Sequence, residues 1–144
     1  MSKKNPKDIS MCTLNNLRKV TRSVSKIYDA SLSNIGLRST QFSLLSTIEK
    51  VDERPISQLA EILVMDRTTL TRNLKPLADK GLIKISTEGD MRIRCIQITK
   101  KGSCLLEKAK PYWEKIQLKL VSEIGEERWS GILDDLSEVL KITK

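Results

Sequence analysis

The sequence predicts a mainly α-helical (α+β) domain in which a helix-turn-helix is followed by a two-stranded wing. Three observations lead to this prediction. Apolar residues recur at helical spacing along most of the 144 residues. Residues 56–81 hold two short helical patterns with only a few residues between them. Residues 82–99 then form two strand-like segments on either side of a Glu-Gly-Asp turn signal.

The first long helix is predicted over residues 8–35. Its apolar side chains recur at helical spacing while basic side chains occupy the other faces, so the helix is amphipathic. Gly36 follows in the position of a C-terminal cap. The apolar stripe consists of Leu14, Leu17, Val20, Val24, Ile27 and Leu32.

A second helix is predicted to start at Ser39 or Thr40. Either hydroxyl can accept a hydrogen bond from one of the free backbone N–H groups at a helix start. The helix presents Phe42, Leu45 and Ile48 on one face. Residues 52–55 are expected to form a loop before the next helix.

The helix-turn-helix begins with a short helix predicted to run to residue 63, with Ser57 as its N-cap. Its helical pattern predicts a buried side for packing against the rest of the domain. The residues expected on that side are Leu59, Ala60, Ile62 and Leu63. Residues 64–66 supply the turn.

Asp66 is predicted to cap the second helix of the motif, because a carboxylate accepts backbone N–H groups and suits the positive end of the helix dipole. Gly81 is expected to close that helix. Its buried stripe is predicted to be Leu70, Leu74 and Leu77. At about 100° per residue, the opposite side carries Thr68, Arg72 and Lys75, flanked by Thr69 and Thr71.

The wing is predicted as one strand that starts at Ile83 and a second that contains Ile96 and Ile98. Two helices finish the chain. The first lies within residues 103–124 and stops at Gly125. The second is marked by Trp129, Leu133, Leu136 and Leu140.

Positive charge is concentrated in the first two-thirds of the chain. The formal net charge is +8, and residues 54–102 carry ten Lys and Arg against five Asp and Glu. Residues 103–144 carry seven against eight. This gradient suits a polyanion such as double-stranded DNA at one end of the molecule. The alternative is an ordinary solvated, lysine-rich surface.

Several residues have the chemistry to contact DNA. An arginine such as Arg72 can donate two hydrogen bonds to guanine, and Lys75 can reach a base or a phosphate. Threonines offer a hydroxyl to phosphate or a methyl group to thymine, and Arg67 suits a phosphate. The predicted DNA-binding set is Ser57, Arg67, Thr68, Thr69, Thr71, Arg72, Lys75, Asp90, Arg92 and Arg94.

The tip of the wing carries Asp90, Arg92 and Arg94. A basic side chain on a narrow ribbon can enter the minor groove, where negative potential concentrates. Asp90 would then accept hydrogen bonds from a neighbouring arginine and hold its guanidinium outward. A polar hairpin tip with no partner is the alternative.

The first and last helices carry more apolar side chains than one small core needs. We therefore interpret residues 8–144 as one domain with a DNA-binding lobe at residues 56–102. Residues 8–35 and 103–142 are predicted to pair with a second copy across a two-fold axis. Such a homodimer would place two recognition helices ~34 Å apart, about one turn of DNA. Packing of these helices on their own core is the alternative.

The three cysteines are Cys12, Cys95 and Cys104, and the chain contains no histidine. None of the cysteines forms a Cys-x-x-Cys pair, so neither a metal site nor a cofactor is predicted. Cys95 and Cys104 are interpreted as small hydrophobic residues.

Three segments together resemble the MarR family of bacterial transcription regulators, over about residues 12–140. They are GLRSTQFSLL before the motif, MDRTTLTRNLKPLADKGLI through it, and DMRIRCIQITKKG in the wing. The last segment matches the family's Asp-x-Arg as Asp90 and Arg92. It matches the closing Leu-Thr-x-x-Gly as Ile98, Thr99 and Gly102.

The resemblance implies a triangular homodimer that binds a near-palindromic operator and regulates transcription, most often as a repressor. It implies recognition-helix contacts from Thr68, Thr69, Arg72 and Lys75. It also implies a wing-tip arginine at Arg92, steadied by Asp90. In many members a small, often phenolic, anion binds between the dimer helices and the DNA-binding lobe and releases DNA. A small-molecule effector therefore stays open as a partner.

The aromatic residues available to such an effector are Tyr28, Phe42, Tyr112, Trp113 and Trp129. We interpret them as core or dimer residues. A thiol-sensing branch of the family uses one cysteine near the start of the first helix. Cys12 lies about two positions before that place, and Asn15 and Asn16 stand where the family's tyrosine is expected. Redox sensing by Cys12 is the alternative kept for this regulator.

Other classes of protein fit less well. The chain has no histidine, Gly-rich phosphate loop or nucleophile elbow, so it is not expected to be an enzyme. A winged-helix protein-interaction module is disfavoured because the basic residues of the DNA face are present. No apolar run spans a bilayer and MSKKNPKD is not a secretory signal, which predicts a cytoplasmic protein. The operator, target genes, effector and sign of regulation are not determined by the sequence.

Overall fold

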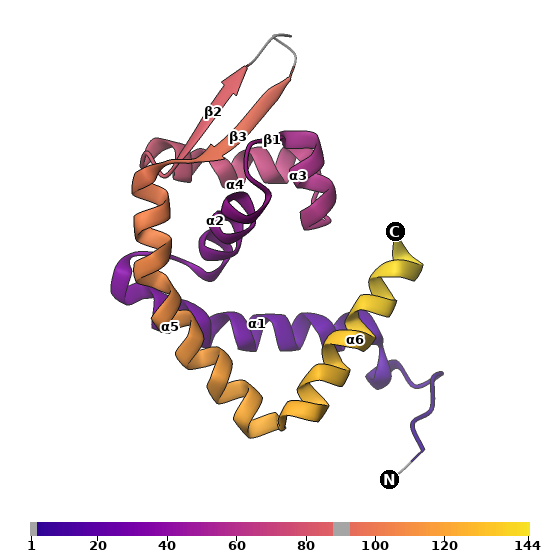
Figure 1. Cartoon of the computed structure of the whole chain (residues 1–144). Helices are drawn as coiled ribbons and strands as arrows, with labels where there is room; N and C mark the ends of the chain where they lie inside the picture. Colours follow the sequence, from indigo (N-terminus) through magenta and orange to yellow (C-terminus); the bar gives the residue numbers. More distant parts are fainter. Residues whose placement is uncertain (1–2, 88–92) are drawn as a thin grey trace.

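The computed structural model describes residues 3–87 and 93–144. Helices α2, α3 and α4 gather beside a small sheet, and α1, the end of α5 and α6 form a separate, extended layer below them (Figure 1). The helices are α1 (Thr13–Leu32), α2 (Ser39–Val51), α3 (Ile56–Leu63), α4 (Arg67–Asp79), α5 (Lys100–Ile124) and α6 (Glu126–Thr143). The strands are β1 (Arg54–Pro55), β2 (Ile83–Thr87) and β3 (Arg94–Ile98).

The first long helix is interrupted at both ends. A 3-10 turn, η1 (Ile9–Met11), precedes α1, and Cys12 lies between them in a non-helical conformation. A second 3-10 turn, η2 (Ser33–Ile35), ends at Gly36, whose φ of 73° is left-handed. The predicted continuous helix from residue 8 is therefore wrong at its start, while the stop at Gly36 is confirmed.

Helix α2 is capped from another helix. Arg38 is its N-cap, and the Arg38 N–H donates to Gln41 Oε1 at 3.1 Å. The Ser39 N–H donates to Asp29 Oδ1 of α1 at 2.7 Å, and this hydrogen bond lowers the pKa of Asp29. The predicted caps at Ser39 or Thr40 are wrong, because a carboxylate from α1 already satisfies this helix start.

The sheet has three antiparallel strands in the order β1-β3-β2. The two wing strands are confirmed, with Ile83 opposite Ile98 and Thr87 opposite Arg94. The two residues of β1 pair with the other edge of β3. The predicted loop at residues 52–55 is therefore wrong in its second half. This short strand covers an edge of β3 that would otherwise stay unpaired.

Helix α3 begins two residues earlier than its predicted cap implies. Pro55 is its N-cap with an extended backbone, and Ser57 lies inside the first turn and is exposed. Ser57 as N-cap is therefore wrong. Ile62 is 51% exposed and Ile56 is 3% exposed. The buried side is thus rotated from the prediction, because the chain enters α3 from β1 and brings Ile56 against the core.

Helix α4 matches its prediction closely. The Asp66 carboxylate accepts the Thr69 N–H at 2.8 Å. After Gly81, at φ 71°, the Leu82 N–H donates to the Leu77 carbonyl at 2.9 Å, as a Schellman ending requires. The predicted stripe is fully buried: Leu70, Leu74 and Leu77 are all 0% exposed.

The core extends beyond the helix-turn-helix and wing. It includes Leu45 and Ile48 of α2 and Leu106 and Ala109 of α5, each at most 1% exposed. Residues 56–102 therefore depend on α2 and the first half of α5 to bury their apolar side chains. Within the described residues, no helix is both long and apolar enough to cross a bilayer.

The end of α4 is tied to the start of α5. Helix α5 starts at Lys100, three residues before the predicted segment, because Thr99 caps it. Thr99 Oγ1 accepts the Gly102 N–H at 3.1 Å and donates to the Gly81 carbonyl at 2.6 Å. Lys101 Nζ also donates to the Lys80 carbonyl at 2.8 Å. These hydrogen bonds join the end of α4 directly to the start of α5.

Gly102 is required at this junction. A Cβ at Gly102 would overlap the carbonyl oxygen of Leu82, which already accepts the Thr99 N–H at 3.0 Å. We expect Gly102→Ala to lower the free energy of unfolding in urea by about 2–3 kcal/mol, because the backbone must shift.

Gly131 of α6 provides the matched control. A Cβ there would meet no described atom within 4 Å, so Gly131→Ala is expected to stabilise the helix by about 0.5–1 kcal/mol. Equal unfolding free energies for the two variants would show that the junction tolerates a side chain.

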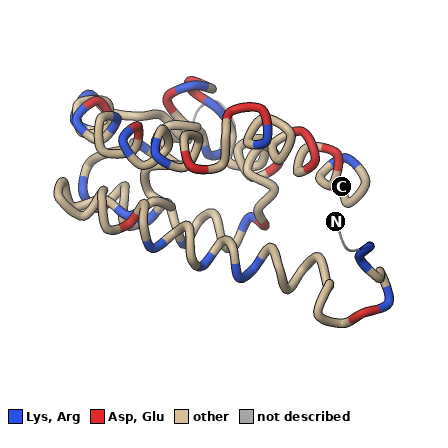
Figure 2. The backbone as a smooth tube through the Cα atoms, turned by 90° about the horizontal axis from the view of Figure 1, so that it is seen from below, with Lys and Arg blue, Asp and Glu red and all other residues tan. Residues whose placement is uncertain are grey.

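An apolar surface is left uncovered on the lower layer. All of α6 is described and none of its residues is buried. Its apolar side chains Ile132, Leu133, Leu136 and Leu140 are 38–45% exposed, and Leu14, Leu17, Val20 and Ile27 of α1 are 37–58% exposed. Basic residues recur along α1 and acidic residues along α6 (Figure 2). These helices carry the surplus apolar stripes that the sequence predicted.

Candidate nucleic-acid interface

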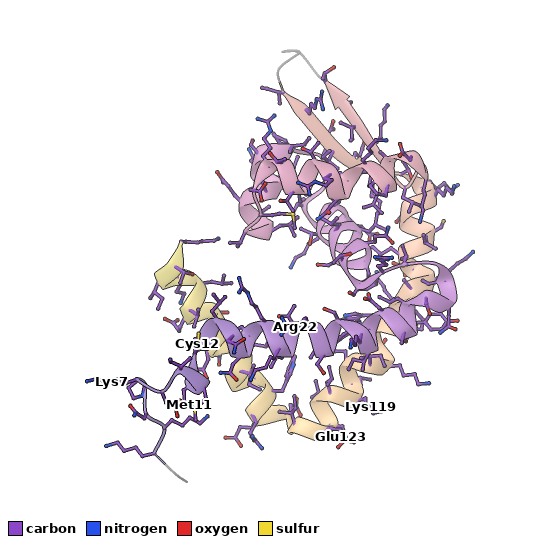
Figure 3. All side chains as sticks on the ribbon, turned by 180° about the vertical axis from the view of Figure 1, so that it is seen from behind. Lys7, Met11, Cys12, Arg22, Lys119 and Glu123 are labelled. Carbon is purple, nitrogen blue, oxygen red and sulfur yellow. The ribbon has the colours of Figure 1, made fainter. Side chains whose placement is uncertain are left out.

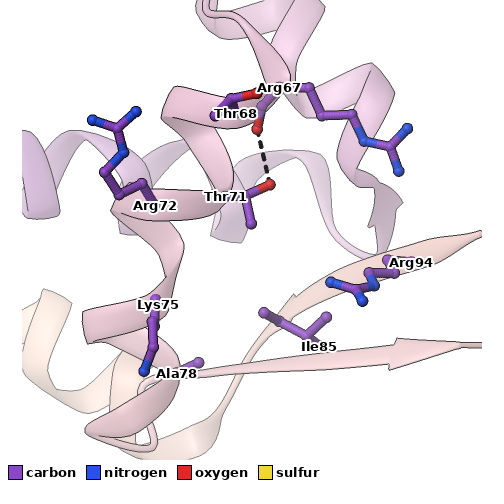
Figure 4. Close-up of a pocket in the computed structure, with 8 residues that line it drawn as sticks. All are labelled: Arg67, Thr68, Thr71, Arg72, Lys75, Ala78, Ile85 and Arg94. Carbon is purple, nitrogen blue, oxygen red and sulfur yellow. Dashed lines mark hydrogen bonds between the residues drawn. The ribbon is translucent and has the colours of Figure 1, made fainter.

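A cleft of about 640 Å³ lies between α4 and the wing strands (Figure 4). It brings together six of the predicted DNA-binding residues from two separate segments of the chain. The residues that line it are Arg67, Thr68, Thr71, Arg72, Lys75, Ala78, Ile85 and Arg94. Those from α4 recur at helical spacing on the side away from its buried leucine stripe.

Four cations among the described residues line the cleft. Arg67, Arg72 and Lys75 come from α4, Arg94 comes from β3, and all four are exposed. Arg94 lies opposite Thr87 and points into the cleft rather than away from α4 (Figure 4). The sequence analysis placed Arg94 on the wing without relating it to α4. The structure adds it to the cationic rim of that helix.

The threonines of α4 have different roles. The Thr69 hydroxyl donates to Asp66 Oδ2 at 2.5 Å, and this hydrogen bond lowers the pKa of Asp66. Thr69 is half-buried and does not line the cleft. The Thr71 hydroxyl donates to the Arg67 carbonyl at 2.8 Å (Figure 4). Only Thr68 and Thr71 therefore face the cleft.

Lys75 has an ionic partner on its own helix. Its Nζ lies 3.0 Å from Asp79 Oδ2, and the two side chains are 76% and 64% exposed. An exposed pair of this kind contributes little to stability. Lys75 can therefore exchange Asp79 for another anion at small cost.

The remaining predicted site residues lie elsewhere. Ser57 is exposed on α3 and does not line the cleft. Asp90 and Arg92 lie outside the described residues, so their predicted roles at the wing tip stay predictions.

Two apolar residues of the cleft, Ala78 and Ile85, were not predicted as site residues. Ile85 is 38% exposed although Ile83, on the same face of β2, is 3% exposed. Alternation along a strand places both isoleucines on one face, so the pattern alone does not distinguish them. They differ because β2 extends past the helices that cover its first residues, which no local signal in the sequence reveals.

Comparison with known proteins identifies the family. The MarR family model matches residues 37–93, which hold α2, α3, α4 and β2. The transcriptional regulator MosR of M. tuberculosis, solved in complex with DNA, is 32% identical. The similarity covers 92% of this chain and 96% of MosR, with a TM-score of 0.84. The chain belongs to the MarR family.

Two further relatives are more distant. A mutant of E. coli MarR complexed with operator DNA has 19% identity and a TM-score of 0.82, over 95% of this chain and 99% of that one, and shares the fold. The Bacillus subtilis HTH-type transcriptional regulator YdgJ, described as uncharacterized, is 25% identical over 105 residues. That match spans 72% of this chain and 64% of YdgJ, just under two-thirds of the relative.

This MarR-family chain has a second hollow, of about 420 Å³, between α2 and α5. Phe42 and Trp113 form one wall, with ring centroids 5.9 Å apart and planes at 18°. Phe42 is buried and Trp113 packs against the core, as the sequence predicted for both. The same two rings are also open to this hollow. Its other lining residues are Ser43, Ser46, Thr47, Lys110 and Glu114.

The cysteines differ in exposure. Cys12 is exposed beside the first turn of α1 (Figure 3), and its carbonyl accepts the Asn16 N–H at 3.0 Å. Cys95 is half-buried in β3. Cys104 is exposed on α5, so its interpretation as a hydrophobic residue is wrong. Its neighbour Leu105 faces the core instead.

Proposed function

We propose that this MarR-family protein is a dimeric, sequence-specific DNA-binding transcription regulator that acts as a repressor. The observation that carries the proposal is the convergence of four exposed cations, from α4 and β3, around one cleft. Cations at such spacing neutralise several phosphates, and the helix between them can reach base edges in the major groove. Within the proposal, residues 56–102 are the DNA-binding lobe.

The uncovered apolar faces of α1 and α6 support the dimer. In the proposal, residues 8–35 and 103–142 bury these faces against a second copy. A two-fold axis then presents two α4 helices to the half-sites of a near-palindromic operator. Arg92 and Asp90 are proposed to complete the wing tip in the minor groove. MosR and E. coli MarR, both solved with DNA, support this arrangement.

The protein is proposed to act by binding rather than by catalysis. The described residues that line the cleft are arginines, a lysine, threonines and two apolar residues. This set holds no carboxylate or histidine that could serve as a general base. It suits the recognition of a polyanion.

A salt titration tests the function directly. The purified protein is titrated against duplex DNA from its own upstream region at several salt concentrations. We expect the logarithm of the affinity to fall linearly with the logarithm of salt, by ~0.9 per phosphate contacted. A footprint is expected to show two symmetric half-sites. A lone subunit that binds no duplex at low salt but retains a protein partner would support the interaction-module alternative instead.

Two release signals can be tested in the same assay. The hollow between α2 and α5 supports a small-molecule effector, because Trp113 offers a stacking face beside the cation of Lys110. Aromatic carboxylates that lower the DNA affinity would identify this signal. The exposed thiol of Cys12 supports the redox alternative. It requires that peroxide releases the DNA and that Cys12→Ser abolishes the release.

A further inference from the structure

The hydroxyl of Thr71 is used inside the helix. It donates its proton to the carbonyl oxygen of Arg67, one turn earlier, at 2.8 Å. This pattern is common for threonine in helices and fixes the side-chain rotamer. The methyl group must then point away from that carbonyl, and in Figure 4 it lies on the side of α4 that faces Ile85 across the cleft.

We propose that Thr71 is a specificity-determining residue that recognises the C5-methyl group of a thymine in the operator. The inference rests on the proposed DNA-binding function and names the base feature that one side chain reads. Among the four bases of DNA, only thymine presents a methyl group in the major groove.

The surroundings of Thr71 favour an apolar contact. Ala78 and Ile85 line the same cleft and offer no hydrogen bond from their side chains. The cations Arg67, Arg72, Lys75 and Arg94 stand around these residues and suit phosphates. Thr71 therefore lies among charged groups that are proposed to bind the DNA backbone. Because its hydroxyl already donates to Arg67, its methyl group is the part of the side chain that is free to contact a base.

The other two threonines of the helix act differently. The Thr69 hydroxyl is bound to Asp66 and stays with the helix cap. Thr68 lines the cleft, and its hydroxyl has no hydrogen-bond partner among residues 3–87 and 93–144. Thr68 thus has a proton to offer a phosphate or base, whereas Thr71 has given its proton to Arg67.

Two substitutions separate the methyl group from the hydroxyl. Thr71→Val keeps a methyl group at the same place in its preferred helical rotamer and removes the hydroxyl. Thr71→Ser keeps the hydroxyl and removes the methyl group. The complementary change in DNA is deoxyuridine, which is thymidine without the C5-methyl group. Each thymine position of the operator half-site is replaced symmetrically in both half-sites.

The protein and DNA substitutions are combined in a double-mutant cycle. Thr71→Val is expected to bind within about twofold of the wild-type protein. Thr71→Ser is expected to lose affinity by roughly fourfold per half-site, the effect of leaving one methyl group in water. Deoxyuridine at one thymine position is expected to cause the same loss for the wild type and no further loss for Thr71→Ser.

Thr143→Ser at the end of α6 is the control, because its hydroxyl also donates to a carbonyl one turn earlier, that of Val139, at 2.8 Å. It removes a methyl group outside the cleft and is expected to leave the DNA affinity unchanged. Circular dichroism melting of all variants checks that the helices remain folded.

The inference and the proposed function fail in different ways. A wild-type protein that binds no duplex overturns both. If the wild type binds but no deoxyuridine position is coupled to Thr71→Ser, Thr71 reads no methyl group and only the inference is overturned. A loss in Thr71→Val that exceeds the loss in Thr71→Ser would mean that the hydroxyl makes the contact, which also overturns it.

Discussion

Replacing Arg72 and Lys75 together with alanine is expected to weaken operator binding by at least about 100-fold. Both side chains are exposed on α4 and belong to the residues that line the cleft. Each interaction with a base or phosphate contributes on the order of 1–3 kcal/mol, and a symmetric dimer makes each of them twice. The slope of affinity against salt is also expected to become shallower by ~0.9 for each phosphate that the variant no longer neutralises.

The measurement is a fluorescence-anisotropy titration of labelled operator DNA at several salt concentrations. Lys7→Ala with Lys50→Ala is the matched control, since it removes the same charge from exposed positions that lie outside the cleft and outside the helices proposed to form the dimer. The control is expected to change the affinity by less than about threefold, through long-range electrostatics alone. Equal losses in the two double variants would mean that net charge, and not the surface of α4, holds the DNA.

Replacing Leu136 with glutamate is expected to separate the dimer and to abolish tight operator binding. Leu136 lies within the exposed apolar stripe of α6 and is 38% exposed in the single chain. Burial of a carboxylate at a dimer interface would leave an unpaired charge without water, which strongly disfavours association. We expect the dimer dissociation constant to rise by at least about 100-fold.

Sedimentation velocity over a range of protein concentrations measures this change. A separated subunit engages one half-site only, so it also loses the gain in affinity that comes from binding two linked half-sites. Gly131→Glu is the control, because it adds the same charge to α6 at a position where a Cβ meets no described atom within 4 Å. A Leu136→Glu protein that remains dimeric and binds operator DNA normally would refute the proposed role of the α6 stripe.

The recognition helix was predictable from local sequence. Its cap at Asp66, its buried leucines and its stop at Gly81 all depend on residues within a few positions of one another. Such signals act through backbone hydrogen bonds and side-chain spacing inside one element, so they are present in the sequence before any tertiary contact forms.

The wrong predictions concern helix starts and a strand whose hydrogen-bonding groups are supplied by residues distant in the chain. The start of α2 is satisfied by Asp29, ten residues earlier, and not by the local hydroxyl of Ser39. Strand β1 exists only because β3, some forty residues later, offers an unpaired edge. Ser57 is not the cap because this strand leads the chain directly into α3. None of these partners is visible to a local pattern.

The cleft also combines features that local sequence predicts with features that only tertiary contacts determine. Helical periodicity alone placed Thr68, Arg72 and Lys75 on one exposed side of α4. The position of Arg94 against that side, and the exposure of Ile85, depend on how far the wing extends past the helix. The use of the Thr71 hydroxyl is also a matter of rotamer, which the residue type leaves open between two states.

Composition, spacing and local capping were enough to establish a basic, helical protein with a helix-turn-helix, a wing and surplus apolar helices at both ends. The tertiary structure determined which groups come into contact. Thr99 joins the start of α5 to the end of α4, and the rings of Phe42 and Trp113 stack beside a hollow. The reason is physical. Periodicity and caps are properties of one segment, whereas a cleft or a junction exists only once chain entropy has been overcome and distant segments pack together.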